Sequence, residues 1–144
     1  MSARELFENI RSERKEIREL NERIELISSR ADAKTMLPQP VIAHTNSISK
    51  VVEDTAIESA ELQKELTIRI KRLKKNIYTA EKIVSQIRCS EYRRVISAYY
   101  LVGDKRVSME DIARRIPCGE GTAWRYFRKG MKVAEDIYIK TIQR

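Results

Sequence analysis

The chain has 144 residues, enough for one domain or for one small domain with helical extensions. Its 29 Lys and Arg residues outnumber its 21 Asp and Glu residues, and the net charge of +8 favours a polyanionic partner, most commonly nucleic acid. Gly (4) and Pro (3) are scarce and charged residues make up 35%, a composition typical of long solvated helices that argues against a β-sandwich or an α/β enzyme.

The sequence predicts neither a metal site nor a cofactor, and it predicts no membrane segment. Cys89 and Cys118 form no CxxC pair, and with His44 as the one histidine a four-ligand zinc site would need acidic ligands as well. The charged N-terminal segment lacks the apolar stretch of a signal peptide, and no apolar run approaches about 18 residues. Two thiols without a secretion signal indicate a reducing, cytoplasmic compartment.

An amphipathic helix is expected over residues 1–30. Its apolar residues recur in steps of three, four and seven, with one polar interruption at Glu13, and they form a heptad stripe: Leu6, Ile10, Ile17, Leu20, Ile24 and Ile27. The other positions are mostly Glu and Arg, which is typical of a solvated face. The stripe needs a partner helix, which is either in the same chain or in another copy.

Residues 31–46 are expected to form a linker, because Pro38 and Pro40 are incompatible with a helix interior. The segment is therefore expected to be partly extended. His44 lies in this linker and is interpreted as a surface residue.

A second amphipathic helix is expected over residues 47–88, capped by Ser47 or Ser49. Its apolar residues keep the same three-, four- and seven-residue steps over about forty residues, with no Gly or Pro among them. A helix of that length must pack on the first helix or self-associate. The basic run Arg69–Lys75 is interpreted as a solvated helix face, with contact to a DNA backbone as the alternative.

Residues 89–144 are predicted to form a trihelical helix-turn-helix domain, and the predicted fold class of the chain is all-α. The first helix of this domain is expected to begin with Ser90 as its cap and to end at Gly103. Its aromatic and aliphatic residues are interpreted as core: Tyr92, Val95, Ile96, Tyr99, Tyr100 and Leu101.

A short second helix of this domain is expected over Met109–Ile116. Ser108 precedes it as the N-cap, and Asp111 three residues later makes a near capping box in which Asp replaces Glu. The turn Pro117–Gly119 cannot continue the helix, and a third helix is expected to begin at about Glu120. A short helix, a tight turn that contains Gly and a second helix make up the helix-turn-helix pattern.

The third helix is expected to turn an apolar face to the core and a basic face to solvent. The expected core positions are Ala123, Tyr126, Phe127 and Met131. Arg125 and Arg128 lie three residues apart and share a face, so one could pair with guanine edges while other cations neutralise phosphates. Trp124 could be a core anchor, a wedge against the DNA backbone or a contact to a thymine methyl group. The candidate DNA-binding residues are Ser108, Glu120, Gly121, Thr122, Trp124, Arg125, Arg128, Lys129 and Lys132.

The segment Glu110–Lys132 resembles region 4 of bacterial sigma factors. Asp111–Ala113 stands at that family's acidic-Ile-Ala element, and Ala123 and Met131 stand at its later Val and Leu positions. The resemblance implies a helix-turn-helix whose second helix is basic and binds DNA.

The sequence departs from this family at two glycines. Gly119 replaces the usual Ser cap and Gly130 replaces a usual Ala. Inside a helix, Gly121 and Gly130 are each expected to cost about 1 kcal/mol relative to Ala.

The layout of the whole chain is similar to that of phage late-transcription regulators of the RinA and ArpU type. Those proteins also have an N-terminal helical part, a Pro-containing linker, a long helix and a sigma-like C-terminal module. Thr122–Arg125 stands where they often have Thr-Val-Tyr-Arg, and the motif-level match covers about Tyr92 to Met131. The resemblance implies a sequence-specific regulator that binds double-stranded DNA and activates late phage genes in the bacterial host cytoplasm. The heptad helices favour a homo-oligomer, and host RNA polymerase is a candidate partner whose contact the sequence leaves open.

Two other DNA-binding functions stay open. A small terminase subunit, which binds DNA for packaging, also combines a helix-turn-helix with a coiled coil, but it would form a ring of about eight or more copies where a regulator should be a dimer or tetramer. A true sigma-like factor would need an aromatic-rich segment for the −10 promoter element, and the upstream sequence has none. An enzyme is not expected, because the chain has one His and no GxGxxG, GxxxxGK[ST] or HExxH motif.

Overall fold

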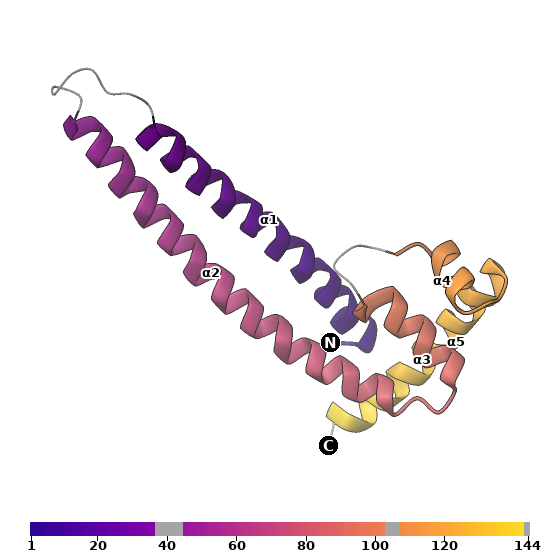
Figure 1. Cartoon of the computed structure of the whole chain (residues 1–144). Helices are drawn as coiled ribbons and strands as arrows, with labels where there is room; N and C mark the ends of the chain where they lie inside the picture. Colours follow the sequence, from indigo (N-terminus) through magenta and orange to yellow (C-terminus); the bar gives the residue numbers. More distant parts are fainter. Residues whose placement is uncertain (37–44, 103–106, 143–144) are drawn as a thin grey trace. The chain divides into compact units, whose positions relative to one another are not determined.

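The computed structural model describes residues 1–36, 45–102 and 107–142. They form six helical elements (Figure 1): α1 (Ala3–Met36), α2 (Thr45–Ser85), α3 (Ser90–Ile96), the π-helix η2 (Ser97–Leu101), α4 (Met109–Arg115) and α5 (Glu120–Ile142). No strand occurs among the described residues, which confirms the all-α prediction.

The helix ends differ from the expected boundaries. α1 continues to Met36, so residues 31–36 of the expected linker are helical. These six residues include two Ala, one Lys and one Met, which are good helix formers, and no Gly or Pro interrupts them. α2 begins at Thr45 and ends at Ser85 rather than at residue 88. The prolines and histidine of the expected linker, Pro38, Pro40 and His44, lie outside the described residues.

The chain divides into two compact units. Residues 1–15 and 72–144 form one unit, here called the terminal unit, and residues 16–71 form the other, called the hairpin unit. The terminal unit is larger than the domain expected over residues 89–144, because it also includes the start of α1 and the last turns of α2. The helices of residues 89–144 bury little apolar surface by themselves, and the start of α1 and the end of α2 supply the missing part of the core.

The core of the terminal unit draws buried residues from every one of its helices. The largest side chains that are fully buried are Phe7 and Ile10 of α1, Ile83 of α2, Ile96 of α3 and Ile112 of α4, together with Ile87 and Val95. The ring of Phe7 stacks on that of Tyr100, with centroids 5.2 Å apart. Phe7 lies beside the heptad stripe and was not among the apolar residues predicted to pack, because the stripe takes only every third or fourth residue.

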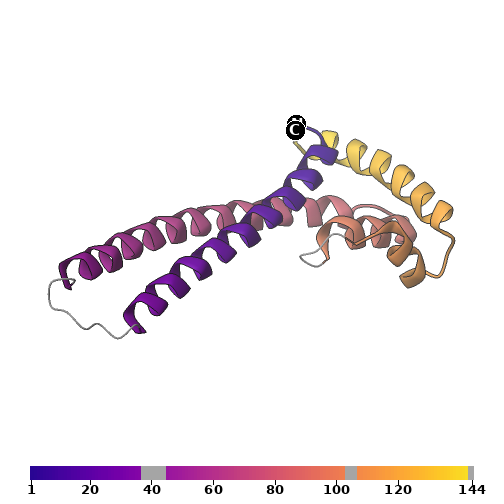
Figure 2. The same ribbon diagram turned by 90° about the horizontal axis from the view of Figure 1, so that it is seen from above.

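Polar contacts also hold the start of α1 in the terminal unit. The Arg14 guanidinium donates hydrogen bonds to the carbonyl oxygens of Tyr100 and Leu101, at 3.2 and 2.9 Å, and so satisfies carbonyls at the end of η2 that have no acceptor role within the helix. The Tyr100 hydroxyl donates to Oε1 of Glu8 at 2.8 Å, and the Arg11 guanidinium lies 4.2 Å from the centre of the Tyr99 ring. Figure 2 shows the first turns of α1 beside the last turns of α5.

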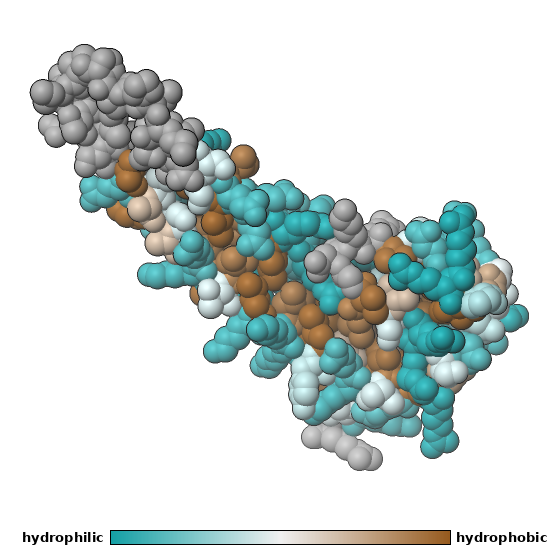
Figure 3. Space-filling model, viewed as in Figure 1, coloured by the Kyte–Doolittle hydropathy of each residue, from teal (hydrophilic) through white to brown (hydrophobic). Residues whose placement is uncertain are grey.

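In the hairpin unit, α1 and α2 pack on each other. Leu20 and Ile27 of α1 and Leu62 of α2 are buried, with Ile24 and Leu66 packed against them. Figure 3 shows hydrophobic side chains along this line of contact and hydrophilic side chains to either side of it. The sequence left the partner of the first helix open, and in this unit the partner is in the same chain.

The first helix expected for the C-terminal domain differs from the prediction at its N-terminal cap and in the geometry of its last turn. Cys89 and not Ser90 occupies the N-cap position of α3, and no side-chain cap bond forms there. The Ser90 hydroxyl instead contacts the Glu91 carboxylate at 3.4 Å. After Ile96 the helix widens into η2, whose last bond joins the N–H of Val102 to the carbonyl of Ser97 at 2.9 Å. The predicted end at Gly103 lies outside the described residues.

Candidate nucleic-acid interface

The N-terminus of α4 has the cap that the sequence predicts. The Ser108 hydroxyl accepts a hydrogen bond from the Asp111 N–H at 3.2 Å and donates one to Oδ2 of Asp111 at 2.9 Å. In a full capping box the longer Glu would accept from the backbone N–H of the cap residue. The shorter Asp111 carboxylate contacts the Ser108 hydroxyl instead. Both hydrogen bonds at this helix start therefore use the Ser108 side chain, which caps α4.

The turn between α4 and α5 is closed by backbone hydrogen bonds. The N–H of Ile116 donates to the Ile112 carbonyl, and that of Cys118 donates to the Ala113 carbonyl, both at 3.0 Å. Pro117 has no N–H and is exposed between them, so it costs no hydrogen bond. α5 then begins at Glu120, as predicted, and its first bond runs from Ala123 to the Gly119 carbonyl at 3.0 Å.

The inner face of α5 is close to the predicted one. Ala123, Phe127 and Met131 are buried, and Tyr126 is half-buried against the same core. Two more turns of the helix add Ala134 and Tyr138. With this face fixed to the core, the period of the helix determines which residues of α5 face solvent.

The outer face of α5 is strongly basic. Arg125, Arg128, Lys129 and Lys132 are all exposed, and no carboxylate occurs in α5 between Glu120 and Glu135. Gly121 and Glu120 are exposed at the start of the helix, whereas Thr122 is half-buried. Of the candidate DNA-binding residues on α5, all except Thr122 are therefore exposed, and they lie in the first half or so of the helix.

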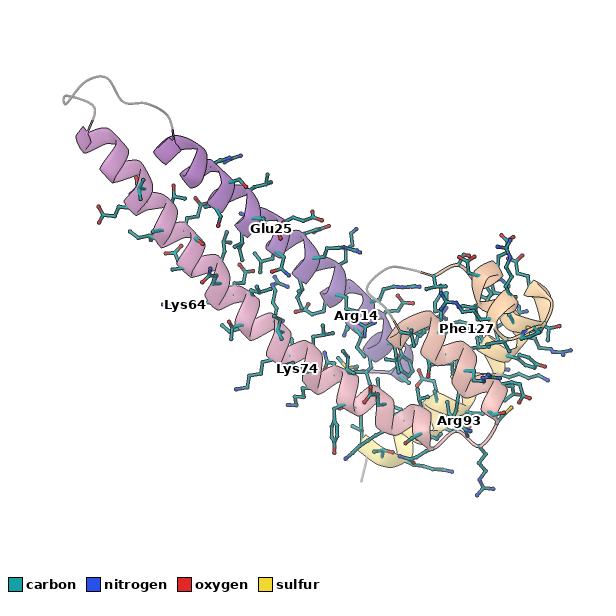
Figure 4. The ribbon with its side chains drawn as sticks, viewed as in Figure 1. Arg14, Glu25, Lys64, Lys74, Arg93 and Phe127 are labelled. Carbon is teal, nitrogen blue, oxygen red and sulfur yellow. The ribbon has the colours of Figure 1, made fainter. Side chains whose placement is uncertain are left out.

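Trp124 lies at the edge between the core and this basic face. Its side chain is 38% exposed, and its ring meets those of Phe127 and Tyr99 edge-on, with centroids 5.8 and 6.3 Å apart. Figure 4 labels Phe127, on which the indole packs. The ring is thus anchored on one side and open on the other, a position compatible with a rigid contact to a partner.

Gly130 has a packing role that the sequence did not reveal. A Cβ atom at this position would lie 2.8 Å from Cδ1, the end of the Ile96 side chain, and 3.1 Å from Cβ of Tyr92, so an added methyl group would have to displace both residues of α3. The expectation that Gly130 simply weakens the helix is therefore incomplete. Gly121 has no atom within 4 Å of such a Cβ, and for it the expectation stands.

A hollow of about 400 Å³ adjoins the basic face of α5. Its lining comes from two helices far apart in sequence: Arg4 of α1, and Phe127, Arg128, Met131, Lys132 and Glu135 of α5. The sequence offered no reason to connect Arg4 with α5, because the two are far apart in the chain.

The start of α1, by contrast, has a recognisable sequence signal. Ser2 and Glu5 form a full capping box, with both hydrogen bonds at 3.1 Å.

In the basic run Arg69–Lys75, Arg69 is half-buried and the other four cations are exposed. In the hairpin unit, Arg69 forms ion pairs with Glu16 and Glu65. In the terminal unit, Arg72 lies 3.7 Å from Glu13. Both arginines of the run thus pair with carboxylates of the chain itself.

Two ionisable groups of the terminal unit have shifted pKa values. Burial raises the pKa of the Tyr100 hydroxyl, and its hydrogen bond to the Glu8 carboxylate raises it further. The Cys89 thiol, 3.2 Å from Oε2 of Glu91, lowers the pKa of that carboxyl. Neither group lies on the outer face of α5. Among the described residues, no three His, Cys, Asp or Glu side chains are grouped to hold a metal ion, and no helix combines the length and apolarity needed to span a membrane.

Comparison with protein-family models, with curated proteins and with solved structures gave no match for the chain. The resemblance to sigma factor region 4 and to the phage regulators therefore rests on the residues named above.

Proposed function

We propose that the protein is a sequence-specific DNA-binding transcription regulator, in which α4, its turn and α5 act as a helix-turn-helix. The observation that supports this most is the outer face of α5. It presents Arg125, Arg128, Lys129 and Lys132 to solvent, with no carboxylate on α5 between Glu120 and Glu135, beside the half-exposed ring of Trp124. A face of this kind suits a phosphate backbone and the edges of bases.

In this proposal α5 lies in the major groove, whose width of about 12 Å accepts one helix. Arg125 or Arg128 reads a guanine, and the remaining cations contact phosphates and provide the salt-dependent affinity. Ser108 has a different role, because its hydroxyl already caps α4. The resemblance to phage late-gene activators adds host RNA polymerase as a partner in this proposal.

A regulator of this type would bind two half-sites about 34–36 Å apart, or a multiple of that, as a homo-oligomer. The heptad stripe does not by itself argue for association between chains, since Leu20, Ile27 and Leu62 are buried within one chain. Solution mass therefore tests the assembly separately. A dimer or tetramer supports the regulator, whereas a ring of about eight or more copies indicates the packaging function of a small terminase subunit.

The test is binding to duplex DNA across a salt series, with sequences selected from a random library and with unselected duplex. We expect a log–log salt slope of several units, about −0.9 for each phosphate contact. Arg125→Ala or Arg128→Ala should reduce the preference for the selected site by about 1–3 kcal/mol. The matched control is Lys140→Ala, which removes an exposed charge near the other end of α5 and should leave binding unchanged.

Two results would contradict the proposal. One is the absence of DNA binding at about 50 mM salt, where electrostatic attraction is strong. The other is binding that neither arginine substitution weakens more than Lys140→Ala does. Fluorescence of Trp124, the single tryptophan, shows in each case whether the variant is folded.

A further inference from the structure

The hollow beside α5 combines an apolar floor with a mainly cationic rim. Phe127 and Met131 form the floor, and three cations and one carboxylate surround it: Arg4, Arg128, Lys132 and Glu135. The rim therefore carries a net charge of +2, from three positive groups and one negative group. Arg128 and Lys132 belong both to this rim and to the outer face of α5, so the hollow is continuous with the proposed DNA-binding face.

Arg4 is held rigidly at this position. Its backbone N–H donates to Oε1 of Glu135 at 3.0 Å, and the capping box of Ser2 and Glu5 encloses the same turn. Ala3 and Leu6 on either side of it are buried in the core. Since these contacts use the backbone and the neighbouring residues, the exposed guanidinium of Arg4 is free to bind without any rearrangement of the helix.

The chemistry of the hollow fits one sugar–phosphate unit of a DNA backbone. A phosphate needs several cations in a shallow site, and the adjoining deoxyribose offers an apolar surface to a floor such as that of Phe127 and Met131. We propose that the hollow binds the DNA backbone beside the groove that α5 occupies, and that Arg4 is an additional phosphate-binding residue. This inference rests on the proposed function and adds to it a contact from the opposite end of the chain.

The experiment compares full-length wild type with Arg4→Ala in the same salt series. We expect the log–log salt slope to fall by about 1, and affinity for selected and unselected duplex to drop by the same factor, about three- to tenfold. Arg4→Lys should keep most of the affinity. The matched control is Lys15→Ala, which removes an exposed charge from α1 in the same unit and should change neither quantity.

A second variant, Glu135→Gln, is expected to change DNA affinity in the opposite direction from Arg4→Ala. Glu135→Gln keeps an oxygen that can accept the Arg4 N–H but removes the negative charge from the rim. DNA binding should therefore tighten, by about two- to threefold, because repulsion of the phosphate is lost. A role in stability alone would lower the unfolding midpoint of this variant without tightening its DNA binding.

The outcomes separate the two proposals. If Arg128→Ala weakens binding but Arg4→Ala matches Lys15→Ala, the inference on Arg4 is overturned and the proposed function stands. If Glu135→Gln weakens binding while the protein stays folded, the inference is also overturned. If no variant differs from wild type, or the wild type binds no DNA, both proposals fail.

Discussion

The backbone N–H of Arg4 donates a hydrogen bond to Oε1 of Glu135 at 3.0 Å, across 131 positions of sequence. A carboxylate at this point satisfies one of the unpaired N–H groups at the start of α1 and complements the positive end of that helix. Together with the stack of Phe7 on Tyr100, the bond makes the first fifteen residues a part of the unit that carries α4 and α5. Changes at the extreme N-terminus should therefore affect the proposed DNA-binding face.

Phe7→Ala should destabilise the terminal unit by about 3–5 kcal/mol, because it empties a fully buried site in the core. Urea unfolding followed by Trp124 fluorescence measures this, since the indole lies in the same unit. The control is Leu26→Ala, at a position 58% exposed in the hairpin unit, which should change the free energy of unfolding by less than about 0.5 kcal/mol. Equal effects of the two substitutions would contradict the packing of α1 on η2.

α5 contains one exposed glycine, Gly121, and one buried glycine, Gly130. Substitution by alanine should change the free energy of unfolding in opposite directions at the two positions. Gly130→Ala should destabilise by about 1–3 kcal/mol, because the added methyl group meets Tyr92 and Ile96 and outweighs the gain in helix propensity. Gly121→Ala has open space and should stabilise by up to about 1 kcal/mol. Thermal and urea unfolding of both variants gives the comparison. Stabilisation by both would mean that α3 and α5 are further apart than the structure shows.

Ser108→Ala should lower the free energy of unfolding by about 0.5–2 kcal/mol, because it removes the cap of α4. Ser108→Asp should restore most of the loss, since a carboxylate can accept the same N–H. Ser90→Ala provides the control, because Ser90 does not cap α3, and its effect should stay within about 0.5 kcal/mol. If Ser108→Ala changes DNA binding but not stability, Ser108 acts through the DNA and not through the cap.

Tyr100 should make the stability of the terminal unit fall at high pH. Its pKa is raised in the folded state above the ordinary value of 10.0, so the folded state holds the phenolic proton more tightly than the unfolded chain does. The contribution of the Tyr100 hydroxyl to the free energy of unfolding is present in full below about pH 10. It is lost as the pH rises further, because the hydroxyl ionises at a lower pH in the unfolded chain than in the folded state.

Tyr100→Phe tests this pH dependence while keeping the stack on Phe7. Near pH 7 the variant should be less stable by about 1 kcal/mol, for the lost hydrogen bond to Glu8. Near pH 11 the difference between wild type and variant should shrink by about 1 kcal/mol. Urea unfolding of both proteins at several pH values gives this difference. The ionisation of the other tyrosines affects both proteins equally and so cancels in the difference. A difference that is constant with pH would contradict the shift.

Features that depend on short stretches of sequence could be predicted well. The all-α class, the cap at Ser108, the start of α5 at Glu120 and the exposure of Arg125 and Arg128 follow from helix period, capping chemistry and turn residues within about one helical turn of each position. The end of α1 at Met36 was not predicted, because the linker was expected to begin at residue 31, several residues before Pro38, the first residue that is incompatible with a helix.

Other features depend on which segments meet in space, and only the tertiary structure decided them. Neither the stack of Phe7 on Tyr100 nor the hydrogen bond between Arg4 and Glu135 has a local sequence signal, because each joins residues more than ninety positions apart. Gly130 reads as a weak helix position until the contact with α3 is known. By itself the sequence determined the helices and the basic face of α5. The tertiary structure determined that the start of the chain completes the core under that face, since a helix periodicity specifies an apolar side but not the partner that covers it.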